Sequence, residues 1–163
     1  MKKLLLVAVV LAGLATTPAT AIPPQQEPTN NSEAALPAGL ACEFPLTVGV
    51  VLDRQTTKTF FNKSGEPIRV QIGGPLIISL TNADTGDSMD VRLAGKLTLD
   101  LRSEEVTLTG TGRIFVALFP TDFPPGPSST ITSGRQVISI DEDGAFHLVS
   151  RVGKVVDVCE ELA

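Results

Sequence analysis

The amino-acid sequence predicts an all-β protein, an antiparallel β-sandwich with a β-barrel as the alternative. The main observation is strict alternation of apolar and polar residues over 68–72, 89–93 and 97–101. Such alternation places the apolar side chains on one face of a half-buried strand. Glycine- and aspartate-rich segments separate the strands at hairpin spacing, and no window keeps the period of a helix. Many short strands joined by regular turns are typical of a sandwich or a barrel.

The other elements follow from the same pattern. Residues 76–80 and 114–119 are more continuously apolar, which predicts strands that are covered on both faces. The remaining expected strands are residues 45–53, 56–61, 106–109, 135–140, 145–151 and 154–158. The expected turns are residues 62–65, 73–75, 84–87, 110–112 and 141–144. A short turn of helix can form at residues 158–162.

Residues 1–21 have the composition of a bacterial secretory signal peptide. Two lysines open the chain, an apolar stretch follows at 4–15, and small residues at 19–21 provide a cleavage site. We expect a product that begins at Ile22 and is secreted or extracellular, either free or associated with the cell wall. The alternative is an uncleaved anchor. No second apolar run approaches the ~20 residues of a membrane-spanning helix, so no transmembrane segment is expected in the mature chain.

The exported chain is expected to have a leader and one domain. Residues 22–41 are rich in proline and almost lack large apolar side chains. This composition predicts a disordered leader, because too little surface can be buried to offset the entropy of ordering. Residues 42–163 contain all the expected strands and are expected to form a single β domain.

Cys42 and Cys159 are the only cysteines, and they flank the expected domain. Export permits a disulfide, and the two ends of a domain often lie close together. We therefore expect one disulfide that joins the N-terminal and C-terminal ends. Two free thiols and a lipid-modified Cys42 are the alternatives.

Charge and residue types exclude several classes of function. The chain has 13 Lys and Arg against 18 Asp and Glu, a formal net charge of −5, and no basic run. Nucleic-acid binding is therefore not expected. Tryptophan and tyrosine are absent and histidine occurs once. The side chains that usually build sugar platforms and metal sites are thus missing, and we expect no cofactor.

A proline-rich connection is the candidate binding site. Residues 119–134 read FPTDFPPGPSSTITSG, and the prolines at 120–127 exclude a paired central strand. Long ordered loops often carry binding sites, and proline limits the entropy that a loop loses on binding. Phe123 is the expected apolar anchor, with charges beside it. The expected contact residues are Asp122, Phe123, Pro124, Pro125 and Arg135.

The leading hypothesis is a non-enzymatic exported domain, which binds a protein or a cell-envelope component of unknown identity. One alternative is a protease inhibitor that presents the loop 120–134. A weaker alternative is a hydrolase that uses His147, the only histidine. No serine stands in a G-x-S-x-G sequence, so no catalytic set is predicted.

Two acidic turns have partial calcium-loop character. Asn82 and Asp84 match the first and third ligand positions of an EF-hand, but Leu93 stands where its last acidic ligand should be. Residues 141–144 also concentrate carboxylates. Ordinary hairpin turns explain both segments, and no metal site is predicted.

Several segments together resemble a family of small secreted proteins of actinobacteria that has no assigned function. The segments are ACEFPL, TNADTGDS, LFPTDFPPGPSSTITSGR, the DEDG turn and the terminal VVDVCEEL. The resemblance covers residues 42–163, and its most specific part is the proline-rich segment with the trailing Gly134-Arg135. It implies export and an all-β domain, and it implies no catalytic residue.

Overall fold

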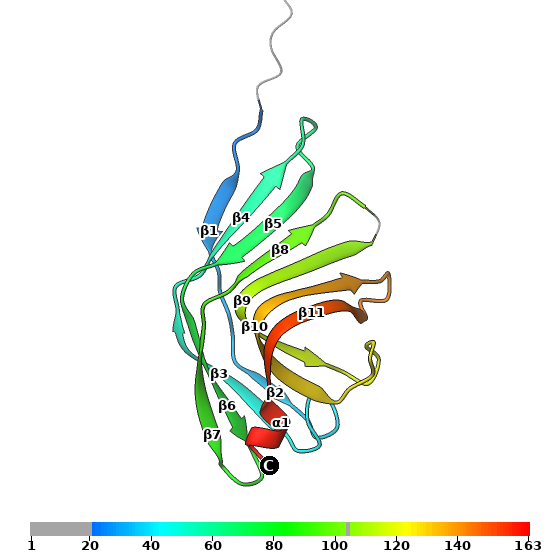
Figure 1. Ribbon diagram of the computed structural model, residues 1–163. Helices are drawn as coiled ribbons and strands as arrows, with labels where there is room; N and C mark the ends of the chain where they lie inside the picture. The colour runs from blue at the N-terminus through cyan, green and yellow to red at the C-terminus, as the bar shows by residue number, and fades with distance from the viewer. Residues whose placement is uncertain (1–20, 104) are drawn as a thin grey trace, which may run out of the picture.

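The computed structural model describes residues 21–103 and 105–163. These residues form two antiparallel sheets with free edges, so the predicted sandwich is confirmed and the chain is not a closed barrel (Figure 1). The predicted signal peptide lies outside the described residues, apart from Ala21. In the part of the chain that is described, no helix has the length and apolar character to cross a membrane.

The larger sheet has the strand order β1-β4-β5-β8-β9-β10-β11, and the smaller has the order β2-β3-β6-β7. In chain order the strands are β1 (Gln25–Pro28), β2 (Ala34–Leu36), β3 (Leu46–Asp53), β4 (Thr56–Phe61), β5 (Pro67–Gly73), β6 (Leu76–Asn82), β7 (Ser88–Leu93), β8 (Lys96–Asp100), β9 (Val106–Leu118), β10 (Ser128–Ile140) and β11 (Phe146–Asp157). The helix α1 (Val158–Glu161) follows β11 directly, as the sequence predicted.

Three of the predicted turns join hairpin strands, a fourth joins strands of different sheets, and the fifth is wrong. The turns at 62–65, 84–87 and 141–144 join consecutive antiparallel strands. Residues 73–75 instead carry the chain from β5 in the larger sheet to β6 in the smaller. Residues 110–112 lie within the single strand β9, which unites two predicted strands.

The long C-terminal strands also differ from the prediction. Two expected strands at 145–151 and 154–158 are one strand, β11. β10 begins at Ser128, so the proline-rich connection is 119–127 rather than 120–134. The last proline of the connection is Pro127, and the β-branched residues after it pair fully with β9.

Three glycines lie side by side where these strands bend. Gly134 on β10 pairs with Gly112 on β9 and with Gly153 on β11. A Cβ atom on Gly134 would overlap the carbonyl oxygen of Val152, and one on Gly153 would overlap that of Ser133. Gly153 also has a φ of +124°, which side chains disfavour. We call Gly112, Gly134 and Gly153 the glycine line.

The bend at the glycine line brings the two ends of β10 together. This strand has 13 residues and would span roughly 40 Å if it were straight. Nevertheless Asp122, before β10, accepts a hydrogen bond from Phe146, after it, at 2.9 Å. Figure 1 shows β9 and β10 turning back, so that the connection between β9 and β10 and the turn between β10 and β11 lie on the same side of the molecule. The fold thereby places two loops from distant sequence next to each other.

The main core lies between the smaller sheet and one half of β9, β10 and β11. This half follows Gly112 on β9, precedes Gly134 on β10 and follows Gly153 on β11. Leu80 and Val91 of the smaller sheet are fully buried in it, together with Ile131 of β10 and Val158 of α1. Phe115 and Ala117 of β9 and Phe119, just after it, pack against this core. Burial of these apolar side chains stabilises the contact between the sheets.

The leader does not conform to the predicted disorder of residues 22–41. β1 pairs with β4, and β2 pairs with β3, so this prediction is wrong for both strands. The side chain of Asn31, between them, donates to Asp53 Oδ2 at 2.8 Å and to Gln55 Oε1 at 3.0 Å. The prediction considered only apolar burial. An edge strand is held by main-chain hydrogen bonds, which any residue except proline can donate.

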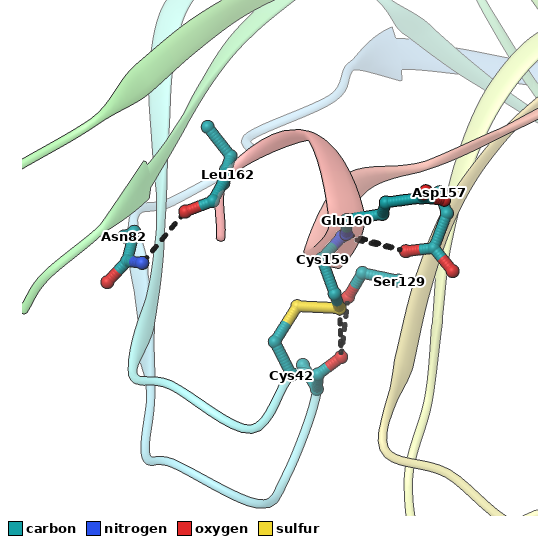
Figure 2. Close-up of a disulfide and its surroundings, with 8 residues drawn as sticks. Cys42, Asn82, Ser129, Asp157, Cys159, Glu160 and Leu162 are labelled. Carbon is teal, nitrogen blue, oxygen red and sulfur yellow. Dashed lines mark hydrogen bonds between the residues drawn. A yellow bond between two sulfur atoms is a disulfide. The ribbon is translucent and has the colours of Figure 1, made fainter. Parts of the chain in front are cut away.

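The predicted disulfide between Cys42 and Cys159 is present, with Cα atoms 5.5 Å apart (Figure 2). Beside it, Ser129 Oγ donates to Ala41 O at 3.0 Å. Asp157 caps α1, since its Oδ1 accepts from the backbone N–H groups of Cys159 and Glu160. The disulfide therefore joins the start of the β domain to a capped C-terminal helix.

Asn82 fixes the other end of α1, because its Nδ2 donates to the carbonyl oxygen of Leu162 at 2.8 Å (Figure 2). Its Oδ1 accepts from the backbone of Asp84 and shapes the turn at 84–87. Both polar atoms of this buried amide are thus used in structure.

Candidate functional site

The connection 119–127 between β9 and β10 is held from inside by Asp122. Its Oδ2 accepts from the backbone N–H of Phe119 at 2.6 Å, and its Oδ1 accepts from that of Phe146 at 2.9 Å. The side chain is only 6% exposed. The prediction that Asp122 is a contact charge is therefore wrong. Its carboxylate instead satisfies backbone donors of two loops, which would otherwise be buried without partners.

Phe123 presents its ring to solvent while its backbone is fixed. The side chain is 66% exposed. The backbone N–H donates to Phe146 O at 2.7 Å, and the carbonyl accepts from Leu148 N at 2.7 Å. Phe123 thus forms a parallel bridge with His147 at the free edge of β11. An exposed ring on a fixed backbone is the arrangement that an apolar anchor needs.

The ring of Phe123 stacks on the imidazole of His147, with centroids 5.7 Å apart and planes inclined by 15°. His147 Nε2 in turn lies 2.9 Å from Asp141 Oδ2. Three features that the sequence presented separately therefore meet in one place: the proline-rich loop, the only histidine and the acidic turn. We call Phe123, His147 and Asp141 the aromatic cluster.

Asp141 holds this cluster in place from the turn at 141–144. Its Oδ1 accepts from the backbone N–H groups of Asp143 and Ala145 at 3.0 and 2.9 Å. The hydrogen bond from His147 lowers the pKa of the Asp141 carboxyl, and the backbone N–H of Ala145 lowers it further. The carboxylate therefore stays charged and holds both the turn and the imidazole ring.

The remaining predicted contact residues divide into two groups. Pro124 and Pro125 are exposed and follow Phe123 directly, so they border the aromatic cluster. Arg135 is exposed but pairs with Val152 on β11, beside the glycine line. Val152 lies roughly 16 Å along the strand from His147 at the usual rise per residue. The prediction that Arg135 flanks the loop is wrong, because Arg135 lies in the middle of β10, well past the end of the loop.

The cluster does not contain a serine nucleophile within the described residues. Ser139 pairs with His147 across β10 and β11, but no hydrogen bond joins its hydroxyl to the imidazole. Ser129 donates to a backbone carbonyl near the disulfide. The imidazole instead forms a hydrogen bond with Asp141 and stacks on the ring of Phe123.

The two acidic turns use their oxygens for local structure. Asn82 and Asp141 each accept backbone hydrogen bonds of their own turns. In the described part of the chain, no three His, Cys, Asp or Glu side chains are grouped so that they could hold a metal ion.

The aromatic cluster could not have been found from local pattern. The sequence signal was the isolated phenylalanine among prolines, and it identified the exposed residue. Its stacking on His147 depends on the bend of three strands. Comparison with protein-family models, with curated proteins and with solved structures finds no match to this chain, so the resemblance to secreted actinobacterial proteins stays a prediction.

Proposed function

We propose that this protein is an exported, non-enzymatic binding domain and that the aromatic cluster is its contact surface. The observation that carries the proposal is the 66% exposed ring of Phe123 on a backbone that is fixed at both its N–H and its carbonyl. Burying such a ring in a partner would contribute on the order of 1.5–3 kcal/mol. Because the loop is already ordered, little of this is lost to ordering on binding.

The surface around Phe123 extends the apolar contact. Pro124 and Pro125 border it on the loop, and Val149 on β11 is 64% exposed. His147 and Asp141 add a polar edge that can accept or donate hydrogen bonds. An aromatic anchor beside a polar edge is typical of protein-binding surfaces. The partner class we propose is therefore a protein or an envelope component that presents an apolar group.

Export is part of the proposal. A disulfide and the lack of a membrane-spanning helix in the described residues are compatible with an extracellular protein. The apolar stretch at 4–15 and the small residues after it support secretion through a signal peptide. Attachment to the cell wall after export is consistent with the same surface.

Protease inhibition is a weaker proposal for this loop. An inhibitor that binds as an added strand offers its main-chain groups to the protease. The N–H and carbonyl of Phe123 are already bonded to β11, so they are not free for this purpose. A hydrolase that uses His147 is weaker still, because Asp141 and the stacked ring account for its imidazole.

The test is affinity capture with the purified protein as bait, from cell-envelope and culture-fluid fractions. Phe123→Ala removes the anchor, and Val51→Ala is the matched control, because Val51 is an exposed apolar residue on β3. We expect a partner that wild type and Val51→Ala retain equally and that Phe123→Ala retains at least tenfold less. A partner held equally by all three proteins, or no partner in either fraction, would overturn the proposed role of the cluster.

A further inference from the structure

A cavity of about 230 Å³ lies between the two sheets, away from the aromatic cluster. Its walls come from β3, β6 and β7 on one side and from β5, β8 and β9 on the other. A dry apolar cavity of about 150 Å³ is large enough to bind benzene. This cavity can therefore hold a larger apolar group, although it is too small for most drug-sized ligands.

The inner end of the cavity is apolar. Leu76, Ile78, Leu93 and Ile114 line it and are buried. Val50 also lines it and is only half-buried, so part of its side chain faces the unfilled space. Unfilled space against such side chains forfeits packing contacts, which an aliphatic chain would restore.

The outer end is polar and carries a positive charge. The lining residues that are exposed, and so mark the opening, are Asn31, Ser32 and Arg113. Arg113 is the one charged residue among the described residues that line the cavity, and no salt bridge in the described chain uses its guanidinium. A guanidinium at the end of an apolar cavity suits a carboxylate or phosphate head group.

The opening has a fixed shape, because the leader crosses from β1 to β2 beside it. Asn31 is bonded to Asp53 and Gln55, and the backbone N–H of Thr29 donates to Gln55 O at 3.0 Å. Asn31 and Ser32 from this crossing line the same cavity as Arg113. The polar end is thus prepared before any ligand arrives.

We propose that this cavity binds a small amphipathic molecule that has an aliphatic tail and an anionic head group. The tail lies between the sheets against Ile78 and Val50, and the head group lies at the opening and accepts hydrogen bonds from Arg113. This site is independent of the aromatic cluster, so the two can be tested separately.

Calorimetric titration of the delipidated protein tests the proposal, with decanoate as the probe below its micelle concentration. Decylammonium has the same tail with the opposite charge. Arg113→Gln removes the charge, and Arg135→Gln is its matched control on β10, outside the cavity. Val50→Phe fills the cavity, and Val51→Phe adds the same group to the exposed side of β3.

We expect wild type and both control variants to bind one decanoate with equal affinity. Arg113→Gln should weaken binding about tenfold, as expected for loss of a charge-assisted hydrogen bond. Val50→Phe should abolish binding, and decylammonium should bind at least tenfold more weakly than decanoate. Failure of wild type to bind decanoate, or undiminished binding by Val50→Phe, would overturn the cavity site. Equal affinity for the two probes would overturn the anionic head group.

Discussion

Phe123 and His147 stack with their ring centroids 5.7 Å apart, and their backbones form a parallel bridge at the free edge of β11. A loop residue therefore has the backbone hydrogen bonds of a strand residue. The two backbone hydrogen bonds of Phe123 and the buried carboxylate of Asp122 produce this order. The arrangement separates two roles: Asp122 positions the loop, and Phe123 makes the contact.

The first prediction concerns this separation. Asp122→Asn replaces one acceptor oxygen with a donor that faces a backbone N–H, so the loop loses a charge-assisted hydrogen bond and gains an unfavourable contact. We expect the free energy of unfolding to fall by roughly 2–4 kcal/mol. Phe123→Ala should cost at most about 1 kcal/mol, because the ring is mostly exposed. Urea unfolding measures both.

The control is Asp87→Asn in an exposed turn, where no described hydrogen bond uses the carboxylate. Its unfolding midpoint should match that of wild type. A large loss of stability in Phe123→Ala would mean that the ring is part of the core, which would contradict its assignment as the contact residue.

The second prediction concerns the disulfide. Cys42 and Cys159 are separated by 117 positions, so the cross-link restricts a long loop in the unfolded chain. Replacing both cysteines with alanine should lower the free energy of unfolding by about 4–5 kcal/mol, the value for a loop of this length. Denaturant unfolding of the double variant beside wild type, both without reductant, measures the difference. A loss below about 1 kcal/mol would show that the core and the capped helix hold the ends together without the bond.

The third prediction concerns the glycine line. Gly153→Ala places a Cβ atom against the carbonyl oxygen of Ser133 and requires a side chain at φ +124°. The two strands cannot keep their pairing, so we expect a loss of at least about 3 kcal/mol. Gly144→Ala is the control, since it also has positive φ, +82°, but nothing lies near its Cβ.

The control should cost only about 1–2 kcal/mol, the usual penalty for a side chain in the left-handed region. Thermal unfolding followed by circular dichroism compares the two variants. Equal losses would mean that φ alone matters at Gly153 and that the close approach of the strands does not.

The fourth prediction concerns pH. The hydrogen bond from His147, followed by the backbone N–H of Ala145, lowers the folded-state pKa of Asp141 below its ordinary value of 3.8. The unfolded chain therefore binds this proton more readily. The stabilisation is fully present above pH 3.8 and is lost as the pH falls through the folded-state pKa.

Asp141→Asn should remove this part of the acid sensitivity. The difference in melting temperature between wild type and variant should be largest near neutral pH and should shrink below about pH 3.8. Asp143→Asn is the control in the same turn, because no described hydrogen bond uses its carboxylate. A constant difference across pH 2–7 for Asp141→Asn would contradict the prediction.

Local pattern determined the fold class and several individual features. Alternation along the strands identified an all-β sandwich, because one side of each strand must be buried whatever its partner is. The positions of Cys42 and Cys159 identified the disulfide, and the isolated aromatic residue among prolines identified Phe123 as an exposed residue. Each of these conclusions depends on a property of one segment.

The tertiary structure alone decided where those segments meet. Main-chain hydrogen bonds are the same for almost every residue, so the sequence did not show that β1 and β2 add to the sheet edges. Nor did it distinguish the glycines of hairpin turns, such as Gly144, from the glycine line. The bend there brings Asp122 to Phe146 and Phe123 to His147. These contacts join loops at opposite ends of β10, and their geometry depends on the pairing of three strands rather than on any one of them.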